Sequence, residues 1–344
     1  MKDVIILAIE TSCDETSMAI VKNGNSVIAM TVLTQMDTHA NFGGVVPEIA
    51  SRMHTENITM VLEDTLEKAG MTIEELDAIA VTYAPGLLGS LLVGVECAKV
   101  LSMVYDKPLI AVNHTMGHIF ANAIDNEMTY PCLALIVSGG HTDLVQMNSA
   151  DDIEFLGSTI DDAVGEVYDK VARVLGLKYP GGPNVDRLSK EGEATYSLPK
   201  PMTKSTYDFS FSGLKSAVIN LVHNEEQRGN EIRKADLARS FQEVAVDELV
   251  RKVELAYQRT NIKEMILAGG VSANQFLRTA MAELSEKYGV HFHVPQFQYC
   301  TDNAGMIGAA AYVLYQKGMF ADFHLNAQSN IDIKSYVEQM KKQD

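Results

Sequence analysis

Two histidines, His114 and His118, stand four positions apart in the stretch NHTMGH. Residues four apart in an α-helix lie on one face, so a helix here would let both imidazoles hold one metal ion. Asp302, in the distant stretch CTDNAGMIG, could supply a carboxylate as a third ligand. Two histidines and one carboxylate with open positions suit Fe(II) or Zn(II) acting as a Lewis acid. The alternative is a polar helix face without a metal.

Three turns rich in glycine or hydroxyl residues follow apolar runs that we expect to be buried strands. They are TSCDETS at 11–17, VSGGHTD at 137–143 and AGGVSAN at 268–274. Glycine lets backbone N–H groups approach a phosphate, because it has no Cβ. None of the turns has a Walker or GxGxxG pattern, so together they favour a different nucleotide cradle, formed between two lobes.

The third turn offers several groups to a nucleoside. Gly269 and Gly270 would let it lie against the backbone, and Asn274 would reach a ribose or a base edge, unless that side chain is simply solvated. Ser272 is expected to cap the helix that follows. In the first turn, Asp14 and Glu15 could act as general acid and base or position a cation, or they could merely end a strand.

Other polar residues have equally plain structural explanations. Asp169 could pair with Arg173 one helical turn away, and Gly182 and Asp186 could be turn residues of the proline–glycine loop YPGGPNVD at 179–186. Lys215, in FSFSGLKS, forms a positive cluster with two nearby lysines and could line a substrate entrance; these are Lys200 and Lys204.

A metalloprotease is disfavoured by the histidine stretch itself. The zincin helix HExxH needs a glutamate after its first histidine as general base, and this chain has Thr115 there.

Composition narrows the class of protein. The 344 residues suffice for about two domains, and 28 Lys and Arg against 45 Asp and Glu give a net charge of −17. That charge disfavours a broad nucleic-acid surface, although a local basic patch or a basic partner subunit remains open. Four scattered cysteines without a CxxC pair indicate reduced thiols in a cytoplasmic protein. The apolar runs at 4–9 and 87–95 are too short or too interrupted for a signal peptide or a membrane span.

The pattern of buried strand, polar turn and returning strand at 4–21 recurs at 133–147, which indicates two similarly folded halves. We expect an N-terminal lobe at 1–130, a C-terminal lobe with helical insertions at 131–318, and a tail at 319–344 that packs back on the lobes. Strands alternating with helices predict an α/β protein whose two lobes face a cleft. Helices are predicted at 47–69, 90–105, 162–175, 213–223, 234–258 and 303–315.

Motifs in the same order along the chain resemble the bacterial-type tRNA N6-adenosine threonylcarbamoyltransferases, once labelled O-sialoglycoprotein endopeptidases. The matching stretches are IETSCDETS (9–17), GGVVPEIASRMH (43–54), NHTMGH (113–118), VSGGHT (137–142), YPGGP (179–183), FSFSGLKS (209–216), GGVSAN (269–274) and TDNAGMIG (301–308). The resemblance implies the actin/Hsp70/sugar-kinase (ASKHA) type of fold, with two RNase-H-like lobes and an interlobe cleft.

The resemblance also implies the roles of particular residues. His114, His118 and Asp302 would bind one divalent metal ion. The adenylate substrate would be held by Ile136, Val137, Ser138, Gly139, Gly140, Asp169, Gly182, Asp186 and Asn274, with His141, Gly269, Gly270 and Lys215 as further possible contacts.

The implied reaction transfers a threonylcarbamoyl group from threonylcarbamoyl-AMP to the N6 amine of adenosine 37, in the anticodon loop of tRNAs that read codons starting with A. AMP is released. The protein would align the anhydride with an acceptor base that has been unstacked, and no covalent nucleophile is needed. Because the chain is acidic, we expect partner subunits to supply positive surface. The resemblance implies that these partners are a two-lobed paralogue and a small ATPase, and we expect the helix from Pro47 to contact the paralogue. A small-molecule kinase of the same fold and a non-catalytic scaffold remain alternatives.

Overall fold

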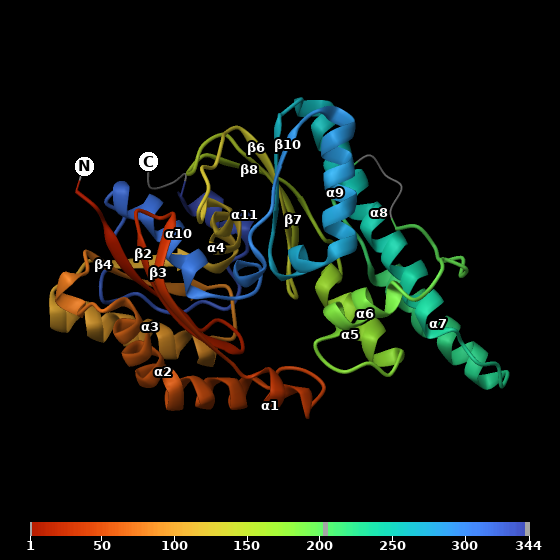
Figure 1. Cartoon of the computed structure of the whole chain (residues 1–344), viewed down its shortest axis with the longest axis horizontal. Coiled ribbons are helices and arrows are strands. Elements are labelled where there is room, and N and C mark those ends of the chain that lie inside the picture. Colours follow the sequence, from red (N-terminus) through yellow and green to blue (C-terminus); the bar gives the residue numbers. More distant parts are fainter. Residues whose placement is uncertain (1, 202–205, 341–344) are drawn as a thin grey trace. The chain divides into compact units, whose positions relative to one another are not determined.

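The computed structural model describes residues 2–201 and 206–340, which form two compact units (Figure 1). One unit combines the residues up to Thr129 with those from Pro295 onward, and the other is Tyr130–Val294. The first boundary agrees with the predicted one, but residues 295–318 belong with the N-terminal unit and not with the C-terminal lobe. The reason is that helix α10 (Ala304–Gln316) packs on strands of the N-terminal unit.

The sheet of the first unit has the strand order β3-β2-β1-β4-β5. β1, β4 and β5 are parallel, whereas β2 and β3 continue from β1 as an antiparallel meander. The strands are β1 (Ile5–Glu10), β2 (Glu15–Lys22), β3 (Ser26–Thr34), β4 (Ala78–Ala84) and β5 (Leu109–Asn113). The continuous apolar sequence of β1 and β4 fits strands that are buried on both faces.

Helices cover both faces of this sheet, with α2 and α3 on one side and α10 on the other (Figure 1). They are α1 (Met36–Ala40), α2 (Pro47–Ala69), α3 (Leu88–Tyr105), α4 (His114–Phe120), α10 and α11 (Ile333–Met340). α2 begins at Pro47 and ends at Gly70 in the left-handed conformation, as predicted. The described part of the tail contacts the same unit, since the Gln328 N–H donates to the Tyr83 carbonyl (2.9 Å).

Helix α3 is long and apolar enough to cross a membrane by length and composition alone. In this unit it packs one face, including Leu91 and Val95, against β4 and α2. Its opposite face exposes Val100, Met103 and Val104. A core helix of a folded domain can have this length and composition too. The prediction that the chain has no membrane span is therefore not tested by α3.

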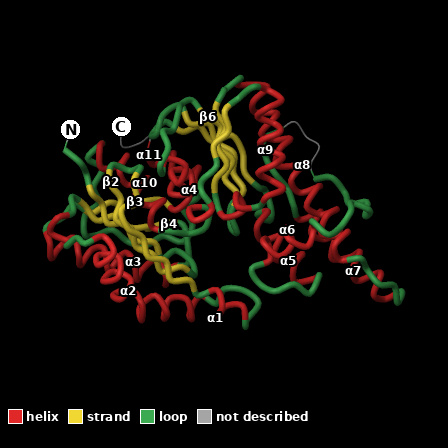
Figure 2. Tube along the Cα trace, in the orientation of Figure 1, coloured by secondary structure: helices red, strands yellow, loops and turns green. Residues whose placement is uncertain are grey.

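The sheet of the second unit repeats the topology of the first. Its order, β10-β9-β6-β7-β8, is again a three-stranded meander with two parallel strands on the other side of its first strand. The sheet is drawn in yellow around the label β6 in Figure 2. The strands are β6 (Cys132–Val137), β7 (Thr142–Met147), β8 (Ile153–Ser158), β9 (Glu264–Ala268) and β10 (His291–His293). The two similarly folded halves indicated by the recurring pattern are therefore present.

The helices of the second unit are α5 (Val164–Val174), α6 (Gly181–Ser189), α7 (Ser212–Gln227), α8 (Lys234–Thr260) and α9 (Gln275–Tyr288). The prediction of a loop through 179–186 is wrong, because α6 begins inside it. Pro183 lies in the first helical turn, where its missing N–H has no intrahelical partner to lose. Asp169 accepts the free Gly181 N–H at 2.7 Å and so caps this helix from α5.

Short 3₁₀ turns complete the two units at Ile73–Glu75, Ala121–Ala123, Gly270–Ala273 and Phe297–Tyr299. The core of the second unit lies between its sheet and helices, where Tyr168 and Phe241 pack edge to face with ring centroids 4.9 Å apart.

Candidate metal centre and nucleotide turns

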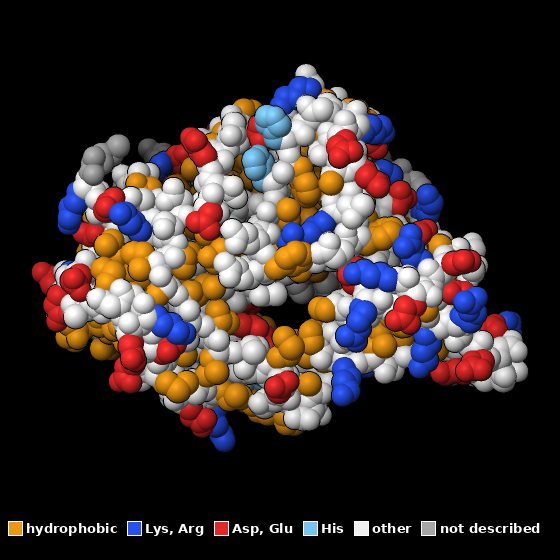
Figure 3. All heavy atoms as spheres, viewed as in Figure 1, with side chains coloured by type: hydrophobic (Ala, Val, Ile, Leu, Met, Phe, Trp, Pro, Cys, Tyr) orange, Lys and Arg blue, Asp and Glu red, His pale blue; other side chains and the backbone are white. Residues whose placement is uncertain are grey.

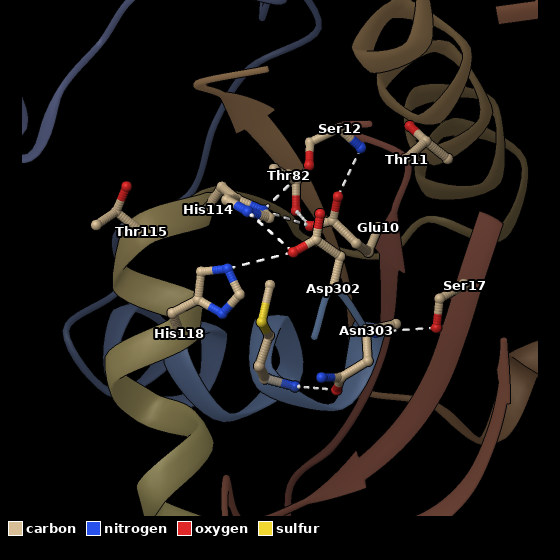
Figure 4. Close-up of polar contacts among 12 residues, drawn as sticks. Glu10, Thr11, Ser12, Ser17, Thr82, His114, Thr115, His118, Asp302 and Asn303 are labelled. Atoms are coloured by element: carbon tan, nitrogen blue, oxygen red, sulfur yellow. Dashed lines mark hydrogen bonds and ion pairs between the residues drawn. The ribbon is translucent and has the colours of Figure 1, made fainter. Parts of the chain in front are cut away.

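The two histidines lie one turn apart on α4, as their spacing predicts, and both face Asp302 (Figure 4). The Nε2 atoms of His114 and His118 lie 3.4 and 3.2 Å from Oδ1 of Asp302. The ligand atoms of the three residues are all within 4.8 Å of one another. The fold therefore brings together two side chains of one helix and a carboxylate almost 190 residues further along the chain.

The histidine helix starts where strand β5 ends. Asn113 is its N-cap, and the Asn113 side-chain oxygen accepts the N–H groups of Thr115 and Met116 at 2.9 and 3.2 Å. Because β1, β4 and β5 are adjacent and parallel, their carboxyl ends meet at one edge of the sheet. His114 thereby lies beside Glu10, the last residue of β1.

Asp302 is placed by the start of α10. The next residue, Asn303, caps that helix by accepting the Met306 N–H at 3.0 Å. The Ala304 N–H donates to Ser17 Oγ on β2 at 3.0 Å, which fixes the helix start to the sheet. A Cβ on Gly308 would lie 2.4 Å from a Val21 methyl, so glycine allows α10 to pack closely on β2.

Glu10 is a buried carboxylate that contacts the other side of the His114 ring. Its Oε2 lies 3.1 Å from His114 Nδ1 and accepts the Thr82 hydroxyl at 2.6 Å, while Oε1 accepts the Ser12 N–H at 2.6 Å. A proton on Nδ1 that donates to Glu10 leaves the Nε2 lone pair free for a metal. Sequence analysis missed this residue, and its only signal was an acid at the end of a wholly apolar strand.

The carboxylates and imidazoles of this cluster shift one another's pKa values. Burial would raise the pKa of Asp302, but the two imidazoles lower it well below its usual range. Burial would lower the pKa of His114, yet the carboxylates of Asp302 and Glu10 raise it well above normal. Among the described residues, His118 Nδ1 has no hydrogen-bond partner, and His118 Nε2 contacts Asp302. The buried carboxylate of Glu10 and the half-buried carboxylate of Asp302 both face imidazole nitrogens, an arrangement that suits a divalent cation.

Asp14 and Glu15 follow β1 on the turn into β2, where Asp14 is buried and Glu15 half-buried. Burial, followed by the negative charges of Asp302 and Asp14, raises the pKa of Glu15 well above its usual value. The Thr34 hydroxyl donates to Glu15 Oε1 at 3.3 Å. The Glu15 carboxyl group therefore lies in the electrostatic field of the candidate metal centre.

In the second unit, the turn after β6 exposes its backbone. The Ser138 N–H donates to the His141 carbonyl at 2.9 Å, and the His141 N–H donates to Ser138 Oγ at 3.1 Å. A Cβ on Gly139 or Gly140 would have no atom within 4 Å, so a ligand can approach the peptide groups there. The Ile136 side chain is fully buried, and its backbone lies between the paired strands β7 and β9.

The third glycine turn lies directly against the end of β6. Gly269 has a φ of +87°, and a Cβ there would lie 2.3 Å from the Val137 carbonyl oxygen. Gly270 faces open space. The two predicted phosphate-binding turns are thus neighbours at the carboxyl ends of the paired strands β6 and β9.

The expected cap of α9 is wrong: Asn274, and not Ser272, begins this helix. Residues 270–273 form a 3₁₀ turn that delays the helix start, and Asn274 Oδ1 accepts the Leu277 N–H at 2.9 Å. The Ser272 hydroxyl is buried without a hydrogen-bond partner among the described residues.

Asn274 and Asp186 are joined through a residue that sequence analysis missed. Gln242 on α8 accepts from Asn274 Nδ2 at 2.9 Å and donates to Asp186 Oδ1 at 3.2 Å. A glutamine inside a long helix carries no sequence signal of such a role. Asp169 lies in a separate contact, at the start of α6 beside Gly182, and burial raises its pKa.

The lysines near FSFSGLKS are engaged with carboxylates. Lys215 forms an ion pair with Asp162 (2.5 Å), and Lys200 forms one with Asp247 (3.2 Å). Lys204 lies outside the described residues. The two described lysines thus neutralise local acids, which weakens the prediction of a positive substrate entrance.

Comparisons with known proteins identify the family of this chain. The sequence model of the family described as TsaD, tRNA N6-adenosine threonylcarbamoyltransferase, matches residues 26–309. The tRNA N6-adenosine threonylcarbamoyltransferase of Staphylococcus aureus strain Newman is 53% identical over 336 residues, covering 97% of this chain and 98% of the relative. The same enzyme of strain JH9 is equally similar.

Two solved structures share the fold at low sequence identity. Full-length HypF in a phosphate- and nucleotide-bound form has a TM-score of 0.62 at 14% identity, over 92% of this chain and 47% of that chain. Component A of the (R)-2-hydroxyglutaryl-CoA dehydratase of Acidaminococcus fermentans has a TM-score of 0.54 at 15% identity, over 91% and 98%. The fold is the two-lobed α/β fold of the actin/Hsp70/sugar-kinase type, and by its sequence this chain belongs to the tRNA N6-adenosine threonylcarbamoyltransferase family.

Proposed function

We propose that this tRNA-modifying transferase takes its threonylcarbamoyl group from threonylcarbamoyl-AMP and delivers it to the N6 amine of adenosine 37, in tRNAs that read codons starting with A. The observation that carries the proposal is the convergence of His114, His118 and Asp302 in a chain of this family. A carbamoyl carbonyl needs an electrophilic partner as charge develops on its oxygen, and this donor set provides a place for one.

His114, His118 and Asp302 would hold one divalent ion, Fe(II) or Zn(II). When bound, such an ion supplies Lewis-acid polarisation of the acyl group. The protein's own part is orientation: Glu10 holds Nδ1 of His114, and the Asn113 cap fixes the start of the helix that carries both imidazoles.

The glycine turns of the second unit would bind the AMP part of the donor. The exposed peptide groups of Gly139, Gly140 and Gly270 suit phosphate oxygens, because no Cβ blocks their approach. Asp186, held by Gln242, and Asp169 would accept hydrogen bonds from ribose hydroxyls, together with the cap residue Asn274. Holding the anhydride in line with the acceptor amine would account for much of the rate enhancement.

Asp14 and Glu15 would position the acceptor amine and take up the proton that it loses when the new C–N bond forms. The position of the two residues supports this role. Both follow Glu10 closely in the chain, where β2 begins, and the charge of Asp302 acts on Glu15. The raised pKa of Glu15 brings that carboxyl closer to the range in which it can accept a proton.

Partner subunits would complete the enzyme in the cytoplasm. The net charge of −17 leaves little positive surface for tRNA, so a two-lobed paralogue and a small ATPase are proposed to contribute it. The exposed apolar side chains Met60 on α2 and Val100, Met103 and Val104 on α3 favour this helical face for the paralogue.

A transfer assay tests the proposed function. Wild-type protein, with its partner subunits, is given threonylcarbamoyl-AMP and unmodified tRNA, and the digested nucleosides are analysed. We expect threonylcarbamoyladenosine from the wild type, its loss in His118→Ala and Asp302→Asn, and full activity in the control His223→Ala, an exposed histidine on α7. Undiminished transfer by both triad variants would contradict the proposed site, and γ-phosphate transfer from ATP to a small molecule would identify a kinase instead.

A further inference from the structure

Strand β10 has the sequence His291-Phe292-His293 and forms one edge of the second unit's sheet. Alternate residues of a strand point to the same face, so the two imidazoles lie side by side. β10 pairs in parallel with β9, and His291 stands in register with Glu264. Histidine side chains show at the surface in Figure 3, over the part of the molecule that Figure 1 labels β10.

One carboxylate is shared by both imidazoles. Oε1 of Glu264 lies 2.8 Å from His291 Nδ1, and Oε2 lies 2.8 Å from His293 Nε2. The side chain of Glu264 is only 10% exposed, whereas those of His293 and His291 are 31% and 78% exposed. A largely buried carboxylate thus stands between two imidazoles that solvent reaches.

We propose that Glu264, His291 and His293 form a second metal site, which takes a first-row divalent cation such as Zn(II), Ni(II) or Cu(II). Imidazole nitrogen and carboxylate oxygen are ligands that these ions prefer, and affinity rises along the series toward Cu(II). Binding replaces the two hydrogen bonds to Glu264 by coordination bonds, as both rings turn toward one point, and water fills the remaining positions.

The site is separate from the candidate metal centre on α4. All three of its residues belong to the second unit, whereas His114, His118 and Asp302 belong to the first. Cys132 pairs in register with Glu264 from β6, but its side chain is completely buried, so it is not counted as a ligand. The proposed site therefore consists of three side chains from two strands.

A cation bound at this site would link the edge strand β10 to its neighbour β9 through coordination bonds. β10 is only three residues long, and the chain passes from the second unit to the first directly after it, between Val294 and Pro295. An ion that binds the folded edge and not the unfolded chain stabilises that edge in proportion to its occupancy. The proposed site would thus make the order of this segment depend on the available metal.

Equilibrium dialysis of the full chain against Zn(II), and separately against Ni(II), tests the proposal by counting bound ions. We expect two equivalents for the wild type and one for the double variant His291→Ala/His293→Ala. His118→Ala should retain the β10 site, and the control His223→Ala, whose ring contacts only Gln227 on the same helix face, should retain both. Glu264→Gln keeps the shape of the side chain and should weaken only the second site.

Cu(II) electron paramagnetic resonance gives a second reading of the same variants. A signal with nitrogen hyperfine structure should persist in His118→Ala and disappear when His291 and His293 are also replaced. Circular dichroism checks that each variant is folded. Retention of two equivalents by His291→Ala/His293→Ala, or a single equivalent in the wild type that His118→Ala abolishes, overturns the proposal without bearing on the transfer reaction.

Discussion

Glu10 and His114 form a buried carboxylate–imidazole pair, with Glu10 Oε2 3.1 Å from His114 Nδ1, while Nε2 of the same ring faces Asp302. The pair fixes which nitrogen is available to a metal, because a neutral imidazole whose single proton is on Nδ1 and donated to Glu10 has its lone pair on Nε2. Thr82 and the Ser12 N–H in turn hold the Glu10 carboxylate. The geometry of the candidate metal centre therefore depends on Glu10, which is not one of its three candidate ligands.

Glu10→Gln should weaken metal binding by about 10- to 100-fold, the usual effect of removing an outer carboxylate from a metal-bound histidine. The amide keeps the shape of the side chain but loses the charge that orients and polarises His114. Metal titration of the two proteins measures the change. Glu96→Gln on α3, which removes an exposed carboxylate paired with Lys99, is the matched control and should leave affinity unaltered. Equal affinity for Glu10→Gln and wild type would show that the pair is only structural.

Gly269→Ala and Gly270→Ala form a matched test of the third glycine turn. At Gly269 the φ of +87° and the Val137 carbonyl 2.3 Å from the new Cβ both oppose alanine, so we expect a loss of about 1–3 kcal/mol in unfolding free energy. At Gly270 the Cβ meets open space, and the change should stay within about 0.5 kcal/mol. Denaturant unfolding measures both.

AMP titration of the same two variants separates folding from binding. Gly270→Ala should reduce AMP affinity despite normal stability, because its methyl group enters the space through which a phosphate approaches the backbone. Unchanged AMP affinity in Gly270→Ala would remove this turn from the proposed nucleotide site.

The features predicted correctly from the sequence are those that depend on residues close together in the chain. Continuous apolar runs identified the central strands β1, β4, β6 and β9, and the spacing of His114 and His118 predicted one helix face. What it did not predict depends on distant contacts. The role of Glu10 follows from the parallel pairing of β1 with β4 and β5, and α6 depends on a cap from Asp169 on another helix.

The strands β3 and β10, which lie at the edges of their sheets, were not predicted. In β3 the apolar run Val27–Met30 has only one buried residue, Ala29, and β10 has only three residues. The domain boundary was misplaced because the small-residue helix α10 could pack on either sheet by its composition. Its partner is decided by glycine-mediated contact with β2, as at Gly308.

Acid should loosen the start of α7 through Asp161. This carboxylate accepts the Phe211 N–H at 2.8 Å and the Ser210 and Ser212 hydroxyls at 2.5 and 2.8 Å. Burial would raise its pKa, but these hydrogen bonds lower it below the usual value. A carboxylate whose pKa is lower in the folded state than in the unfolded state stabilises the fold at pH values above its unfolded-state pKa of about 4. This stabilisation is lost as the pH falls through the folded-state pKa.

Hydrogen exchange at Phe211 and Ser212, followed from neutral pH downward, measures this effect. Protection should fall in the acid range in the wild type, whereas Asp161→Asn should be less protected at neutral pH and show a flatter pH dependence. Asp208→Asn, a neighbouring acid, is the control. The idea fails if Asp161→Asn keeps the wild-type slope.

Gln242 should be needed for nucleotide binding although it lies inside a helix far from any glycine turn in sequence. Gln242→Leu keeps the volume of the side chain but removes the hydrogen bonds to Asp186 and Asn274, and each buried polar group left without a partner costs about 1–3 kcal/mol. We expect both a lower unfolding free energy and weaker AMP binding, because the Asp186 carboxylate is no longer held in place. Gln258→Leu on the same helix, where the side chain donates to the hydroxyl of the half-buried Tyr288 at 3.2 Å, is the matched control and should change neither. Loss of stability with unaltered AMP affinity would assign Gln242, and Asp186 with it, to the core and not to the nucleotide site.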